Sequence, residues 1–338
     1  MHFISTHRCN AHCVMCGIWN EVDSRADELA PEDLDEILAD RLFSAMEFVG
    51  VSGGEPFVRE DLPEICRVIL GRCAKVQRVS LTTNGLLCKR MSRTLPEIAD
   101  EISAARRLLD VSVSVHGIGE GLDSIYGVDG AFQKIERTTE LLEELRNDGR
   151  LSFSMNCVLL ADNLHQAREL KVWAADRTIP LNFVIGEDRH RFRTEGLDGA
   201  FATGDDMGEL VGFLGELVDD PALSAVTAGK YREIIAMLEG RKERSLSCYY
   251  AMGGLVLGHD GRLFYCSHSR DIGSCRERSP WEIYVDPENL AYREEELIQR
   301  ECRRCPPYTR TRREIGKDLP RVLIEVVRRR LRKPRSNS

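Results

Sequence analysis

The chain has 338 residues, of which 30% are charged, and its net charge is −8. The negative charge argues against a general nucleic-acid-binding protein, and no apolar run approaches the roughly 18 residues that span a bilayer. The first residues lack the basic and then apolar pattern of a secretion signal, so we expect a cytoplasmic protein with no membrane or nucleic-acid partner.

Strand-like and helix-like segments alternate through the first 190 residues. This alternation is typical of βα units that form a parallel sheet. Two helices are expected over residues 61–70 and 131–146, where apolar residues fall on one helical face. The predicted strands are residues 2–6, 46–51, 76–82, 110–116, 151–159 and 179–185.

Three of these strands alternate polar and apolar residues, whereas buried parallel strands usually read as continuous apolar runs. Because the side chains of a strand alternate between its two faces, each polar set shares one face. We expect helices on the apolar face and a polar lumen on the other. The alternative is an exposed sheet face on a two-layer domain. The polar sets are Ser80, Thr82 and Asn84; Ser112, Ser114 and His116; and Ser152, Ser154 and Asn156.

Twelve cysteines favour metal or redox chemistry over disulfides in a cytoplasmic chain. Three of them follow the first predicted strand with the spacing Cys9-x3-Cys13-x2-Cys16. Soft thiolates suit iron–sulfur clusters, and three ligands leave one iron of a four-iron cluster without a protein ligand. The alternative is a structural zinc site completed by His7 or His12.

Two further motifs follow the next predicted strands: Ser52-Gly53-Gly54-Glu55-Pro56 and Thr82-Thr83-Asn84-Gly85. The segment that carries Cys9, Cys13 and Cys16 is called the cysteine loop below. Together with this loop, the identity and order of the two motifs resemble the radical S-adenosylmethionine (SAM) superfamily over residues 1–190. The resemblance implies an α/β fold, a partial (β/α)6 TIM-like barrel. It also implies a [4Fe-4S] cluster on the three cysteines, with SAM at the open iron. SAM would be cleaved to a 5′-deoxyadenosyl radical.

The resemblance also implies which residues contact SAM. Gly53 and Gly54 would let the backbone approach its methionine end, where Glu55 would accept from the ammonium and Pro56 would stiffen the turn. Residues suited to the ribose and adenine are Thr82, Asn84, Ser114, Asn156, Gly186 and Met15, the last at a position that is commonly aromatic in the family. His116 could serve as a base; the alternative is a histidine hydrogen-bonded at a strand end.

Cysteines recur near the C-terminus, as Cys248-x12-Gly261-x4-Cys266 and then Cys302-x2-Cys305. This pattern resembles a Twitch domain, the shortened relative of the SPASM domain, and implies one auxiliary [4Fe-4S] cluster. Residues 258–261 predict a hairpin turn. A zinc ribbon is the alternative. Cys275 is a candidate substitute ligand, or else an incidental thiol.

The sequence therefore predicts four parts. These are a radical SAM partial barrel over 1–200, a helical connector over 201–247, a Twitch/SPASM-like auxiliary-cluster domain over 248–312, and a basic helix or tail over 313–338.

The function we expect is that of a radical SAM oxidoreductase, which abstracts hydrogen from a small polar metabolite and receives electrons from a flavodoxin- or ferredoxin-type donor. The auxiliary cluster would accept an electron or anchor the substrate. Only eight residues precede Cys9, so we expect no fused leader-peptide domain. The first alternative is a peptide maturase acting on a precursor peptide. The second is a zinc-stabilised binding protein without catalysis.

Overall fold

The computed structural model describes residues 1–20, 27–186, 203–204, 206–307 and 312–332. The chain divides into two compact units. The first comprises Met1–Phe201 and Leu255–Leu290, and the second comprises Ala202–Gly254 and Ala291–Ser338. No described helix has the length and the apolar character needed to cross a membrane.

Six parallel strands form the core of the first unit, paired in the order β6-β5-β4-β3-β2-β1. Every predicted strand is confirmed, with its ends displaced by two residues at most. The strands are β1 (His2–Thr6), β2 (Phe48–Gly53), β3 (Arg78–Thr83), β4 (Leu108–Ser114), β5 (Ser152–Leu159) and β6 (Leu181–Ile185).

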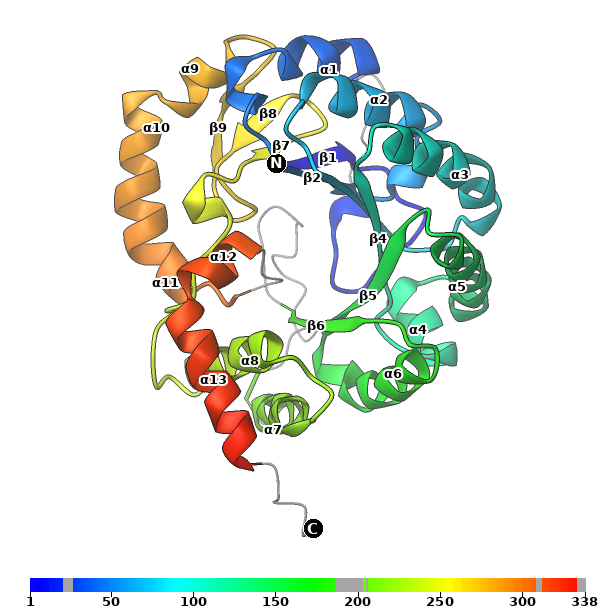
Figure 1. Ribbon diagram of the computed structural model, residues 1–338, viewed down its shortest axis with the longest axis vertical. Coiled ribbons are helices and arrows are strands. Elements are labelled where there is room, and N and C mark those ends of the chain that lie inside the picture. Colours follow the sequence, from blue (N-terminus) through cyan, green and yellow to red (C-terminus); the bar gives the residue numbers. More distant parts are fainter. Residues whose placement is uncertain (21–26, 187–202, 205, 308–311, 333–338) are drawn as a thin grey trace. The chain divides into compact units, whose positions relative to one another are not determined.

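Helices follow the strands of this unit and lie outside them (Figure 1). The predicted helices 61–70 and 131–146 correspond to α2 and α5. The helices are α1 (Pro31–Leu38), α2 (Leu62–Arg72), α3 (Cys88–Ala104), α4 (Gly119–Tyr126), α5 (Ala131–Asn147), α6 (Leu164–Asp176), α9 (Pro280–Tyr284) and α10 (Pro287–Tyr292), the last of which ends in the second unit. Short 3-10 turns are η1 (Ile18–Asn20), η3 (Arg41–Phe43), η4 (Pro56–Val58) and η5 (Ala161–Asn163).

The two faces of the sheet differ as the alternation predicts. Apolar side chains such as Val79, Val111 and Met155 are fully buried. The opposite face carries hydroxyls and amides in register across neighbouring strands, with Ser114 beside Asn156. Asn156 donates to the Ser112 hydroxyl and accepts from Asn182 Nδ2 at 3.1 Å. The inner face of the strands therefore holds a connected polar row.

Three more strands extend the sheet beyond β1: β7 (Val256–Leu257), β8 (Arg262–Phe264) and β9 (Asp271–Ser274). The antiparallel pair β7–β8 confirms the predicted hairpin. β7 also pairs in parallel with β1, His2 opposite Val256. The hairpin thus belongs to the first unit, a long-range pairing that local sequence patterns do not contain.

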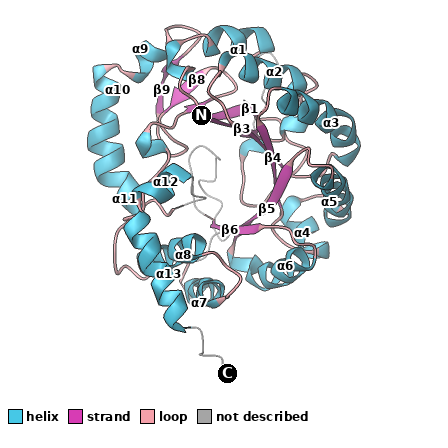
Figure 2. Cartoon of the chain, viewed as in Figure 1, coloured by secondary structure: helices cyan, strands magenta, loops and turns pink. Residues whose placement is uncertain are grey.

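The second unit is helical in the part that the structure describes (Figure 2). Leu210, Phe213, Leu214 and Leu217 of α7 are buried, as their helical spacing predicts. α13 packs on α8, and Arg232 pairs with Glu325 at 3.0 Å. The elements are α7 (Asp206–Asp219), α8 (Ala225–Leu238), η7 (Tyr250–Met252), the π-helix η8 (Arg293–Glu301), α11 (Cys302–Arg304), α12 (Arg312–Lys317) and α13 (Leu319–Arg332).

Candidate active site

The three sequence motifs meet at the carboxyl edge of the parallel strands. The cysteine loop follows β1, the Ser52–Pro56 turn ends β2 and the Thr82–Gly85 turn ends β3. Carboxyl ends of parallel strands are where α/β folds bind their ligands. Other predicted residues lie on later strands: Ser114 at the end of β4, Asn156 in β5 and Gly186 after β6.

The cysteine loop is attached to the C-terminal end of α4. The backbone N–H of His12 donates to the Tyr126 carbonyl at 2.8 Å, and that of Val14 donates to the Ile125 carbonyl at 3.0 Å. These two bonds flank Cys13 and fix the backbone on both sides of it. Met15 is 8% exposed, so this loop buries its own apolar side chain.

The glycines of the β2 turn make a close backbone contact with the cysteine loop. Gly54 N–H donates to the Thr6 carbonyl at 2.8 Å, and Glu55 N–H donates to the Arg8 carbonyl at 2.9 Å. A Cβ on Gly54 would lie 2.2 Å from the Arg8 oxygen, and Gly53 has a φ of +134°. The close approach expected of these glycines is therefore made to the chain's own backbone, and any approach to SAM stays a prediction.

Glu55 connects the second motif to the third. Its carboxylate is fully buried and accepts from Phe57 N–H at 3.0 Å, from the Thr83 hydroxyl at 2.9 Å and from Asn84 N–H at 2.7 Å. Burial raises the pKa of Glu55 to about 7, although these hydrogen bonds favour the ionised form. Its expected role as acceptor for the SAM ammonium stays a prediction, and the link to β3 is one that the sequence did not reveal.

Asn84 connects the third motif back to the cysteines. Its Nδ2 donates to Asn10 Oδ1 at 2.8 Å and lies 3.6 Å from Cys9 Sγ. Its Oδ1 accepts from Leu86 N–H at 2.9 Å. The side chain that we expected to contact the ribose is thus bonded to the cysteine loop.

The three thiols fit an iron–sulfur cluster by their chemistry. Burial, and then the neighbouring charges of Glu55 and Cys16, raise the pKa of Cys9 to about 11. Burial and the other two thiols also raise the pKa of Cys13. Soft thiolates are the ligands that iron–sulfur clusters take, and cationic iron would offset the cost of ionising these thiols. No three His, Cys, Asp or Glu side chains of the described residues lie close enough to hold a single metal ion.

The two histidines of the zinc alternative have aromatic partners. The His7 ring lies against His259, with ring centroids 3.9 Å apart. The His12 ring meets Trp19 edge-on at 4.9 Å. Both rings therefore pack against aromatic neighbours.

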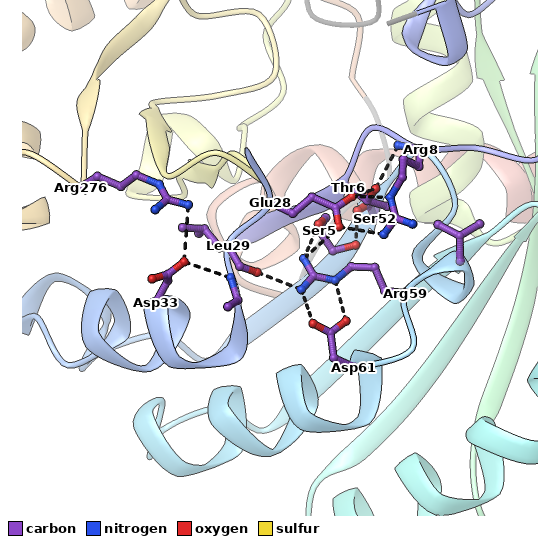
Figure 3. Close-up of polar contacts among 12 residues, drawn as sticks. Ser5, Thr6, Arg8, Glu28, Leu29, Asp33, Ser52, Arg59, Asp61 and Arg276 are labelled. Atoms are coloured by element: carbon purple, nitrogen blue, oxygen red, sulfur yellow. Dashed lines mark hydrogen bonds and ion pairs between the residues drawn. The ribbon is translucent and has the colours of Figure 1, made fainter. Parts of the chain in front are cut away.

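A network of ion pairs, which the sequence did not predict, lies where the cysteine loop begins (Figure 3). Arg8 donates to both oxygens of Glu28, at 2.8 Å each, and the Thr6 hydroxyl also donates to Glu28. Burial alone would raise the pKa of Glu28, but the bonds from Arg8 and Thr6 outweigh it and hold this pKa below its usual range.

Buried Arg59 adds the second half of the network (Figure 3). It pairs with Asp61 at 2.5 Å and donates to the carbonyls of Ser5 at 2.8 Å and Leu29 at 2.9 Å. Arg59 therefore joins β1 to the segment just before α1. Neither Arg59 nor Glu28 belongs to a periodic pattern, so no local signal could have revealed them.

His116 is buried and hydrogen-bonded. Its Nδ1 accepts from Val158 N–H at 3.0 Å, and its ring meets Tyr126 edge-on at 5.6 Å. Burial lowers the pKa of His116 to about 3. These contacts are those of a hydrogen-bonded histidine at a strand end, and the role of His116 as a base stays a prediction.

The C-terminal cysteines are divided between the units. Cys266 follows β8 in the first, and Cys248, Cys302 and Cys305 lie in the second. Within the second unit, Arg244 donates to the carbonyls of Ser247 at 3.0 Å and Cys305 at 3.3 Å, which brings their segments side by side. The auxiliary cluster stays a prediction.

Cys275, the candidate substitute ligand, has a half-buried thiol with carboxylates nearby. Burial, and then the carboxylates of Asp40, Asp260 and Asp271, raise the pKa of its thiol to about 12. The pKa values of Cys9 and Cys13 are raised as well, so this shift does not decide between a substitute ligand and an incidental thiol, and both interpretations of Cys275 stay predictions.

A family comparison matches the model of the radical SAM superfamily to residues 3–174. The chain belongs to the radical SAM superfamily. Members use a [4Fe-4S] cluster together with SAM, and these are the cofactors of this chain. Membership also favours the enzyme over the zinc-stabilised binding protein.

Curated relatives resemble part of the chain. A probable GTP 3′,8-cyclase of Metallosphaera sedula is 31% identical over 49% of this chain and 48% of its own length. A PqqA peptide cyclase of Bradyrhizobium diazoefficiens is 29% identical over 49% of this chain and 40% of its own length. The match thus spans about half the length of these relatives or less.

Solved structures share the fold. SuiB of Streptococcus suis, crystallised with S-adenosylmethionine, has a TM-score of 0.62 at 15% identity and covers 87% of this chain and 67% of its own. The partial barrel predicted from sequence is therefore the fold of this protein.

Proposed function

We propose that this radical SAM enzyme removes a hydrogen atom from a small polar metabolite. Cys9, Cys13 and Cys16 hold the [4Fe-4S] cluster in this proposal. When bound, the cluster and SAM would supply the one-electron chemistry and the group that accepts the hydrogen. The observation that carries the proposal is the convergence of the cysteine loop with the Gly54 and Asn84 turns at one edge of the sheet.

The chain's own residues orient the reactants and exclude water. The backbone bonds from Gly54 and Glu55, and from His12 and Val14, hold the cysteine loop in place. The three cysteines are half-buried, which limits the access of water to the cluster site. A preorganised site of this kind needs little rearrangement when SAM binds.

The polar row on the inner face supports a polar substrate. Hydroxyls and amides lie near the carboxyl edge of the parallel strands, on Thr82, Ser114 and Asn156. The SAM ribose and a polar substrate would need hydrogen-bond partners there. The relative of Metallosphaera sedula is named for a nucleotide substrate, which supports the same class. The auxiliary cluster that the C-terminal cysteine pattern predicts would accept the second electron of an oxidation.

A peptide maturase is the second candidate, because one relative is a PqqA peptide cyclase. The two candidates differ in which molecule loses hydrogen. Anaerobically reconstituted protein is incubated with SAM, dithionite and deuterated candidates of each class, and deuterium in 5′-deoxyadenosine is measured. Label from nucleotides, sugars or cyclitols supports the first candidate. Label from peptides alone overturns it in favour of the second.

A further inference from the structure

We propose that Asn84 is a positioning residue whose side-chain N–H···S hydrogen bond to Cys9 raises the reduction potential of the SAM-binding cluster. The inference rests on the proposed ligation by Cys9. It assigns Asn84 to the cluster rather than to the ribose.

The orientation of the Asn84 amide is determined by its other partners. Oδ1 accepts from Leu86 N–H at 2.9 Å, which only the amide oxygen can do. Nδ2 must then face the cysteine loop, with one proton for Asn10 Oδ1 at 2.8 Å and the second for Cys9 Sγ at 3.6 Å. Every polar group of the amide is therefore used.

The backbone of Asn84 is also held, because its N–H donates to the buried carboxylate of Glu55 at 2.7 Å. Glu55 N–H in turn donates to the Arg8 carbonyl, next to Cys9. The contacts form a closed ring from the cysteine loop through Glu55 and Asn84 back to Cys9. The donor consequently cannot turn away from the sulfur without breaking several bonds.

Cys9 differs from Cys13 and Cys16 in the hydrogen-bond donors that its sulfur receives. Backbone N–H groups donate to these sulfurs, from Ala11 to Cys9 and from Ile18 to Cys16. Within the described residues, a side-chain donor acts on Cys9 and on neither of the others. Electron density on cluster sulfur increases on reduction, so a hydrogen-bond donor stabilises the reduced state and raises the potential.

The test is an EPR-monitored redox titration of the full-length, anaerobically reconstituted protein and its Asn84→Asp variant. The signal that changes on adding SAM identifies the cluster concerned. Asn84→Asp keeps an acceptor for Leu86 N–H but turns a carboxylate oxygen towards Cys9. We expect about a tenfold lower ratio of reduced to oxidised cluster at a fixed potential, which is about 59 mV for one electron. Asn84→Ala should give a smaller fall in the same direction.

Asn10→Ala is the matched control, because it removes the other partner of Nδ2 and leaves the sulfur contact. Its potential should stay near that of the parent. Unchanged potentials in both Asn84 variants, or an equal fall in Asn10→Ala, would overturn the inference. If Cys9→Ala protein still forms the SAM-responsive cluster, it is the proposed ligation that fails.

A second readout needs no change at Asn84. Asn10→Ala protein labelled with asparagine carrying side-chain 15N should give a 15N coupling in the pulsed EPR of the reduced cluster. Absence of this coupling contradicts the hydrogen bond, even where an Asn84 variant fails to hold iron.

Discussion

Arg8 and Glu28 form an ion pair with two hydrogen bonds at the start of the cysteine loop. Both nitrogen–oxygen distances are 2.8 Å, and the Glu28 side chain is 4% exposed. Because Arg8 directly precedes Cys9, the pair fixes where the cysteine loop leaves β1.

Replacing Glu28 by Gln should destabilise the protein strongly. The change leaves Arg8 without its buried partner and removes a carboxylate 3.9 Å from Arg59. Breaking one side of a buried pair costs about 3–5 kcal/mol. We expect the free energy of unfolding in urea to fall by about 3 kcal/mol. Glu97→Gln is the control, since Glu97 pairs with Arg67 on the surface, where the cost is about 1 kcal/mol or less. Equal losses of unfolding free energy in the two variants would contradict a stabilising role of the Glu28 ion pair.

Stability should also depend on pH through Glu55. Its pKa is raised from 4.5 to about 7, so the folded protein favours the protonated acid. The stabilisation that comes from this pKa difference is fully present below about pH 4.5 and is lost as the pH rises through 7. The free energy of unfolding should fall by about 3 kcal/mol over that range. Urea unfolding of parent and Glu55→Gln protein across this range measures it. The difference in unfolding free energy between the two proteins should change with pH in that window. A difference that is independent of pH would contradict burial as the cause.

Gly54→Ala should separate the β2 turn from the cysteine loop. The added Cβ would meet the Arg8 carbonyl at 2.2 Å, so one backbone must move. We expect at least a tenfold loss of SAM cleavage and a lower iron content, because a shift of about 1 Å can cost 100-fold in rate. Gly71→Ala in α2 is the control, since its Cβ meets nothing within 4 Å. Parent-like iron and cleavage in Gly54→Ala would show that the close approach is dispensable.

His116→Asn should keep most of the activity. Asn can supply an oxygen to accept from Val158 N–H, which is the contact that His116 Nδ1 makes. Since the pKa of His116 is about 3, its titration should leave no limb in the rate profile near neutral pH. Steady-state rates from pH 6 to 9 should therefore have the same shape in both proteins. A limb of the pH–rate profile that is present in the parent and absent from the variant would show that His116 acts as a base.

The parallel core was predictable because its signals are local. The period-two alternation of Ser112, Ser114 and their neighbours placed one face inward, and the burial of Val111 and Val113 bears this out. The three motifs were predictable from their residues and order alone.

Long-range contacts were not predictable in the same way. Asn84 fitted a lumen-facing position, but only the fold shows that its amide faces Cys9. The pairing of β7 with β1, and that of Arg8 with Glu28, join segments with no shared local pattern. His116 was left open between two roles because burial, which decides its pKa, is a property of the folded chain.

The central claim is that Cys9, Cys13 and Cys16 hold the cluster that cleaves SAM. The most direct measurement is 5′-deoxyadenosine formed under dithionite by parent, Cys13→Ala and Cys66→Ala proteins, each reconstituted anaerobically. Cys66 is a buried thiol of α2 that belongs to no motif and serves as the control. We predict that Cys66→Ala cleaves SAM like the parent and that Cys13→Ala forms no product. Equal cleavage by Cys13→Ala and the parent would contradict this account.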